Sequence, residues 1–75
     1  MKNTLDRIEN ALKDRQLETT SKSLYIHFLL FPNKAAIVRC YELNIELKTF
    51  YSHRKKLIEN EYMLSHGKDN IELIK

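Results

Sequence analysis

Long polar side chains share one side of the stretch from Leu47 to Asn60. If this stretch is helical, its apolar residues gather on one side and its polar residues on the other, at about 100° per residue. The outward residues are Lys48, Ser52, Lys55 and Glu59, with Thr49 and Lys56 beside them. Lysine ammonium groups bind anionic oxygens, and a serine hydroxyl both donates and accepts hydrogen bonds. The set suits recognition of a polyanion rather than the breaking of covalent bonds.

Positive charge is concentrated around this stretch. Residues 34–58 hold six basic side chains against two acidic ones, so the segment carries +4, whereas the whole chain carries +3. The basic residues are Lys34, Arg39, Lys48, Arg54, Lys55 and Lys56. A surplus confined to one segment predicts contact with phosphate groups, because a surplus that served only solubility would be spread more evenly.

Two neighbouring residues extend the basic set. His53 lies at the border of the polar face and can contact phosphate in either protonation state. Arg54 falls within the apolar stripe, so its aliphatic stem would lie over the core while its guanidinium group reaches the rim. At that rim the guanidinium group would meet either a backbone phosphate or an internal carboxylate, and the sequence leaves both open.

No pattern of residues predicts catalysis or metal binding. The serine, histidine and acidic residues form no nucleophile elbow, no metal-ligand spacing and no glycine-rich phosphate loop. A chain of 75 residues also encloses a catalytic pocket with difficulty. We therefore expect no enzyme activity, no metal and no cofactor. His27 is alone among apolar neighbours and is expected to be a hydrogen-bonded or edge-exposed histidine rather than a metal ligand.

Cysteine content and apolar runs indicate the compartment. The one cysteine, Cys40, excludes an internal disulfide and suits a reducing environment, and its apolar neighbours predict a small core residue. The most apolar stretch, Leu24 to Phe31, is too short to cross a bilayer. We expect a cytoplasmic protein without a membrane segment.

Four helical stretches are expected to position the basic set. The first covers residues 1–17. The second begins near Ser21 or Ser23 and ends at Phe31, because Pro32 pushes the residue before it out of helical geometry.

A third helix, at residues 35–43, is joined to the helix at residues 47–60 by a tight turn at residues 44–46. Asn33 is the expected cap of the third helix. Its expected inward residues are Ala36, Ile37, Cys40 and Tyr41. The tail alternates as paired strands do, over residues 61–65 and 70–75 around a loop that contains the single glycine.

In this order, residues 21–75 resemble a winged helix-turn-helix DNA-binding domain. Asn44 stands at the bend where such units often have glycine, and it tolerates left-handed backbone geometry. Glu46 is expected to accept hydrogen bonds from the first amides of the next helix. Glu61 replaces the glycine that the family usually carries there. The resemblance implies that helix 47–60 enters the major groove. It also implies that the hairpin tip, with Lys68 and His66, contacts the adjacent minor groove or backbone, and a hairpin that only caps the core is the alternative.

The fold class expected is therefore mainly α with a small C-terminal β-hairpin, preceded by an extra N-terminal helix, in a single domain over residues 1–75. The function expected is sequence-specific binding of double-stranded DNA, by a small transcriptional regulator or by a phage or plasmid replication or partition factor. The alternative is a protein-binding winged helix, such as an antirepressor or an adaptor, because the fold alone does not decide function.

The N-terminal helix carries a narrow apolar stripe. Its residues are Leu5, Ile8, Ala11 and Leu12, and Asn3 or Thr4 is the expected N-cap. A lone helix of this length is marginal in water, so the stripe must pack against something. We favour a homodimer arm formed by Leu5, Ile8 and Leu12 of two copies, and docking on its own domain is the alternative.

Overall fold

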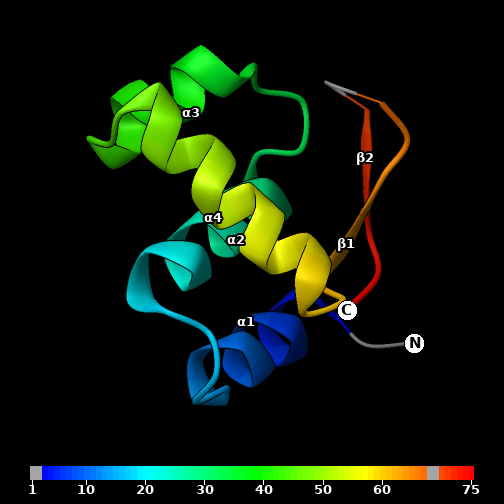
Figure 1. The fold of residues 1–75 in the computed structure, drawn as a ribbon. Coiled ribbons are helices and arrows are strands. Elements are labelled where there is room, and N and C mark those ends of the chain that lie inside the picture. Colours follow the sequence, from blue (N-terminus) through cyan, green and yellow to red (C-terminus); the bar gives the residue numbers. More distant parts are fainter. Residues whose placement is uncertain (1–2, 68–69) are drawn as a thin grey trace.

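The computed structural model describes residues 3–67 and 70–75 (Figure 1). These residues form helices α1 (Thr4–Lys13), α2 (Thr19–Leu30), α3 (Ala36–Leu43) and α4 (Leu47–Glu59), followed by strands β1 (Met63–Ser65) and β2 (Ile71–Leu73). The two strands pair antiparallel. The expected fold class, mainly α with a C-terminal β-hairpin and an additional N-terminal helix, is confirmed.

Helix α2 is the centre of the core. It lies between α1 and α3 in Figure 1, with α4 across it. Its Leu24, Tyr25 and Phe28 are buried, and the ring of Phe28 lies 6.1 Å from that of Phe50 on α4. The burial of these residues agrees with the sequence of α2, which is apolar on nearly every side of the helix. None of the described helices is long and apolar enough to span a membrane.

The start of α2 lies at Thr19, earlier than the sequence predicts. Ser21 was a candidate cap, but its hydroxyl is fully buried and bonds to His53 on α4. The N-cap position belongs to Glu18, whose carboxylate makes no capping hydrogen bond and pairs instead with Lys56. Two tertiary contacts have therefore replaced local capping at this helix start.

The turn between α3 and α4 has the expected left-handed residue, Asn44, with φ of 56°. The amide of Ile45 donates to the carbonyl of Cys40 at 3.0 Å, and that of Asn44 to Tyr41 at 3.3 Å. This pair of bonds is the Schellman arrangement, which satisfies carbonyl groups at the end of a helix. Glu46 occupies the N-cap of α4, but its side chain forms no capping hydrogen bond, so that part of the prediction is wrong.

Helix α4 ends in the same way. Glu61 has φ of 64°, the amide of Tyr62 donates to the carbonyl of Leu57 at 2.9 Å, and the amide of Glu61 donates to Ile58 at 3.1 Å. The left-handed geometry that favours glycine is thus present at the position where the sequence has glutamate.

The inward face of α3 differs from the prediction. Ile37 and Tyr41 are 70% and 87% exposed, while Arg39 and Cys40 are buried. The inward residues follow the helical repeat i, i+3, i+4, i+7, namely Ala36, Arg39, Cys40 and Leu43. The N-cap of α3 is Ala35 rather than Asn33.

Helix α1 docks on its own domain. The side chain of Asn3 caps it by accepting from the amide of Asp6 at 2.8 Å, as expected, and the helix ends at Lys13. Ala11 is fully buried, and the hydroxyl of Tyr62 donates to the carboxylate of Asp14 at 2.6 Å. This contact joins the end of α1 to the residue that leads into the hairpin.

The hairpin is shorter than the sequence predicts. Met63 pairs with Leu73, and Ser65 pairs with Ile71. Met63 is fully buried beneath the helices, and the amide of Ile74 donates to the carbonyl of Tyr62 at 3.0 Å. The hairpin is therefore fastened to the core at the end nearest α4.

Candidate nucleic-acid interface

The outer face of α4 is open to solvent. Lys48, Ser52, Lys55 and Glu59 are all exposed, as the periodicity predicts. Phe50 and Leu57 on the opposite side are buried and fix the rotation of the helix. Among the described residues, Lys48 and Lys55 have no ion-pair partner within 4.0 Å. Their ammonium groups are therefore free to meet an external anion.

Lys56 and Thr49 lie on the flank of that face. Thr49 is half-buried. The ammonium group of Lys56 lies 2.5 Å from the carboxylate of Glu18, so its charge is already matched within the protein. Lys56 lowers the pKa of the Glu18 carboxyl through this hydrogen bond and through its charge. Its first role is to hold the start of α2 against α4.

His53 is not on the polar face, which corrects the prediction. Only 9% of the residue is exposed, and its Nδ1 lies 2.6 Å from the hydroxyl of Ser21. It falls on the same side of α4 as Phe50 and Leu57. Because Ser21 lies 32 positions earlier in the chain, the periodicity of α4 alone gives no sign of this partner.

Within the described residues, the internal carboxylate expected for Arg54 is not its partner. Its guanidinium group donates to the hydroxyl of Ser65 and to the carbonyl of Gly67, each at 3.2 Å. Arg54 therefore ties α4 to the turn of the hairpin. Lys68, the candidate at the hairpin tip, lies outside the described residues, and His66 pairs with Glu72 at 2.9 Å.

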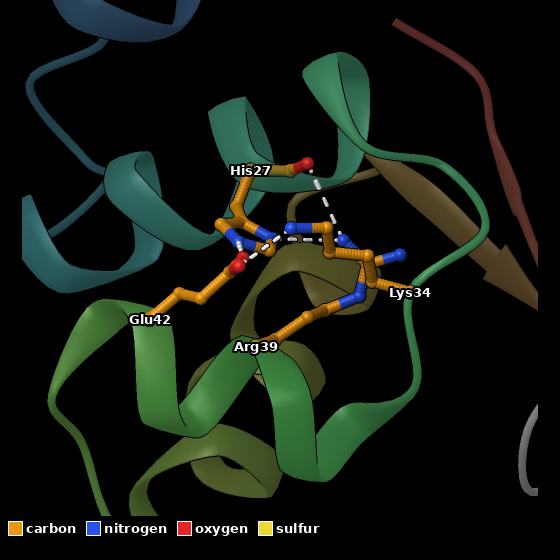
Figure 2. A network of polar contacts seen from close by, with 4 residues as sticks. All are labelled: His27, Lys34, Arg39 and Glu42. Carbon is orange, nitrogen blue, oxygen red and sulfur yellow. Dashed lines mark hydrogen bonds and ion pairs between the residues drawn. The ribbon is translucent and has the colours of Figure 1, made fainter.

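Lys34 belongs to a polar cluster between α2 and α3 (Figure 2). Its ammonium group lies 2.5 Å from one carboxylate oxygen of Glu42, and the other oxygen lies 2.7 Å from Nε2 of His27. The hydrogen bond from Lys34, followed by that from His27, lowers the pKa of the Glu42 carboxyl. The charge of Lys34 is therefore balanced internally.

Arg39 is the buried cation of the same cluster. It is only 2% exposed, and its guanidinium carbon lies 3.9 Å from the centre of the Phe28 ring. One terminal nitrogen lies 2.9 Å from Nδ1 of His27 and donates to the carbonyl of His27 at 3.3 Å. Burial lowers the pKa of Arg39. The signal in the sequence for the burial of Arg39 was its place in the helical repeat with Ala36, Cys40 and Leu43.

These contacts set the protonation pattern of His27. Because arginine is only a donor, Nδ1 of His27 must accept, so its proton is on Nε2 and is donated to Glu42. The expectation of a hydrogen-bonded histidine is confirmed. Within residues 3–67 and 70–75, no three His, Cys, Asp or Glu side chains are grouped to hold a metal ion.

A groove runs beside α4, between the α2–α3 connection and β2. Its volume is about 580 Å³. It is lined by Phe28, Pro32, Asn33, Lys34, Ala35, Ala36, Arg39, Phe50, Tyr51, Arg54, Asn70 and Ile71. The groove lies on the flank of α4 that carries Tyr51 and Arg54, not on the outer face.

Comparisons of the chain with protein-family models, with curated proteins and with solved structures found no match. The assignment of function therefore depends on the geometry described above.

Proposed function

We propose that the chain is a winged helix-turn-helix protein that binds double-stranded DNA in a sequence-specific manner, through the outer face of α4. It would act as a small transcriptional regulator or as a phage or plasmid replication or partition factor. The observation that carries the proposal is that Lys48 and Lys55, on either side of Ser52, have no ion-pair partner in the described part of the chain.

The dimensions of this face suit a major groove. Lys48 and Lys55 are seven residues apart, which corresponds to about 10 Å along a helix. A major groove about 12 Å wide admits a helix, whose long cations reach phosphates while shorter polar groups reach base edges. Ser52, between the two lysines, would contact base edges.

The test is a titration of labelled duplex DNA from the protein's own upstream region, followed by fluorescence anisotropy at several salt concentrations. Lys48→Gln with Lys55→Gln should weaken binding and reduce the salt slope by about two units, about 0.9 for each lost phosphate contact. The matched control is Lys13→Gln with Arg15→Gln, which removes the same charge from exposed positions near the end of α1. Equal affinity and slope in the two double variants would exclude the outer face of α4 as the DNA contact.

The exposed stripe of α1 supports a homodimer as the DNA-binding form. Leu5 and Leu12 are 76% and 55% exposed although α1 is already docked through Ala11, and Ile8 is half-buried. Burial of such side chains contributes about 1.5–3 kcal/mol each. Pairing through α1 would place two copies of α4 on one DNA face, on an inverted repeat with half-sites roughly 34 Å apart or a multiple of that.

Sedimentation of the intact protein tests the dimer. We expect a dimer at about ten micromolar, where an association of about 1 μM is largely complete. Leu5→Ser with Leu12→Ser should give a folded monomer that binds DNA much more weakly, because two half-site contacts are no longer linked. A wild-type monomer at that concentration would contradict the dimer.

One observation favours the alternative of a protein partner. Ile37 and Tyr41 lie one turn apart on the outside of α3, and both are largely exposed. A large aromatic side chain in such a place is typical of protein interfaces. If the Lys48/Lys55 variant binds DNA as the wild type does, an antirepressor or adaptor that uses the basic face becomes the better assignment, with Ile37 and Tyr41 as an added contact.

A further inference from the structure

The side chains that line the groove beside α4 carry more positive charge than the described carboxylates around them neutralise. Lys34, Arg39 and Arg54 line the groove, and no aspartate or glutamate of residues 3–67 and 70–75 is among the lining residues. Glu42 lies next to the groove and matches Lys34. Among the described residues, Arg54 donates only to uncharged oxygens, and Arg39 bonds directly only to His27. Within the part of the chain that the structure describes, the guanidinium groups of Arg39 and Arg54 therefore have no hydrogen-bonded carboxylate.

Arg39 directs unused donors into the groove. Of its three guanidinium nitrogens, one terminal nitrogen bonds to His27, and the other two have no acceptor among the described residues. In the described part of the chain, every buried side-chain nitrogen or oxygen that is sealed from solvent has a partner. The two free nitrogens of Arg39 must therefore keep some contact with solvent although the residue is 98% buried. Figure 2 shows the second terminal nitrogen pointing away from His27 and Glu42.

The start of α3 adds hydrogen-bond donors at the same place. The groove is lined by Ala35 and Ala36, and no side chain caps this helix start. The first amides of a helix have no acceptor within the helix and attract anions. The guanidinium group of Arg39 and the uncapped start of α3 thus line the same groove.

The remaining walls combine apolar side chains with the polar residues Asn33 and Asn70. Phe28, Phe50, Tyr51 and Ile71 line the groove, and its volume falls within the range of about 300–1,000 Å³ that is usual for small-molecule sites. An anionic group at the α3 end would therefore leave an organic body in contact with aromatic and aliphatic side chains.

We propose that this groove binds a small phosphomonoester, with its phosphate between Arg39 and Arg54 at the start of α3 and its organic body against Tyr51 and Ile71. A phosphomonoester carries about −1.5 to −2 charges at neutral pH and three acceptor oxygens, which matches two guanidinium groups better than a single carboxylate does. The site lies on the flank of α4, apart from Lys48, Ser52 and Lys55, and so is distinct from the proposed DNA contact.

The test is an NMR titration of the ¹⁵N-labelled full chain, without DNA, in which sodium chloride keeps the ionic strength constant. The probes are phenyl phosphate and inorganic phosphate. We expect saturable shifts at the amides of Ala36 and Ile37 and at the side chain of Arg39, with phenyl phosphate binding more tightly because its ring contacts the apolar wall. Equal affinity for the two probes would overturn the assignment of an organic body, and shifts that do not saturate would overturn the site itself.

Arg54→Gln provides the matched variant, because its side chain is half-buried and its hydrogen bonds are to neutral groups. It should weaken phenyl phosphate binding by about tenfold or more, the usual effect of losing a charged hydrogen bond. The control is Arg15→Gln, the same change at an exposed position outside the groove. If both variants bind as the wild type does, or if both weaken binding equally, the phosphate is held by general charge attraction and the proposal is wrong.

Discussion

The contact between Tyr62 and Asp14 offers a sharp test of how α1 is held. Tyr62→Phe removes only the hydroxyl that donates to the Asp14 carboxylate at 2.6 Å. The ring of Tyr62 is buried and lies edge-on to Tyr25, with 4.9 Å between the ring centres, and the variant keeps this packing. Phenylalanine also leaves no buried donor without a partner, because the donor itself is removed.

The expected loss of stability follows from the type of bond. A hydrogen bond to a charged acceptor contributes about 1.5–3 kcal/mol. Asp14 is half-buried and its carboxylate can be rehydrated, which places the loss near the lower end, at about 1.5 kcal/mol. In a domain of this size, 1 kcal/mol corresponds to a shift in Tm of about 4–8 °C, so Tm should fall by roughly 6–12 °C.

The loss should depend on pH. The hydrogen bond from Tyr62, followed by that from the amide of Gln16, lowers the pKa of the Asp14 carboxyl below its ordinary value of 3.8. A carboxyl whose pKa is lower in the folded state stabilises the fold above its unfolded pKa, and this stabilisation is lost as the pH falls through the folded pKa. Burial raises the pKa of Tyr62, so the tyrosine stays protonated throughout. The difference in free energy of unfolding between wild type and Tyr62→Phe should therefore have its full value at pH 7 and become smaller below about pH 3.8.

Urea denaturation followed by circular dichroism at pH 7 and at acidic pH measures this difference. Tyr41→Phe is the control, because Tyr41 is 87% exposed and should unfold as the wild type does. The reasoning fails if Tyr62→Phe leaves stability at pH 7 unchanged, or if the loss is the same on both sides of the Asp14 titration.

Two further predictions concern the end of α4 and the cysteine. Glu61→Gly should raise the free energy of unfolding by up to about 1 kcal/mol in denaturant titrations, because glycine removes the strain of φ 64° but loses more backbone entropy on folding; a clear loss of stability would contradict this. Cys40 is buried and burial raises the pKa of its thiol, so the folded protein should react with iodoacetamide far more slowly than the unfolded protein at neutral pH. Mass spectrometry over time measures this rate, and equal rates in the two states would show that the thiol is accessible.

Helical periodicity was sufficient to predict the exposure of residues on α4 whose surroundings depend only on the rotation of that helix. The exposed positions Lys48, Ser52 and Lys55 follow from the 3.6-residue repeat of α4. The left-handed turn at Asn44 follows from the few residue types that tolerate positive φ.

The same approach failed for polar residues whose partners lie far away in the chain. His53 was expected at the polar border, yet Ser21 on another helix makes its burial favourable. Arg39 was counted only in the net charge of residues 34–58, and the expected inward face of α3 included Ile37 and Tyr41 in its place. A buried cation is costly unless its donors are satisfied, and the partner that satisfies Arg39 in part, His27, lies on another helix.

The way in which α1 is attached has a consequence for hydrogen exchange. The helix has ten residues, and a helix so short does not persist by itself in water. We therefore expect α1 to lose its contact with Tyr62 and its helical structure in one event. The packing of α2 against α4 should remain during this event. Such a subglobal opening needs less free energy than complete unfolding. The amide hydrogens of α1 then exchange together as one group, and they do so before those in the buried middle of α2.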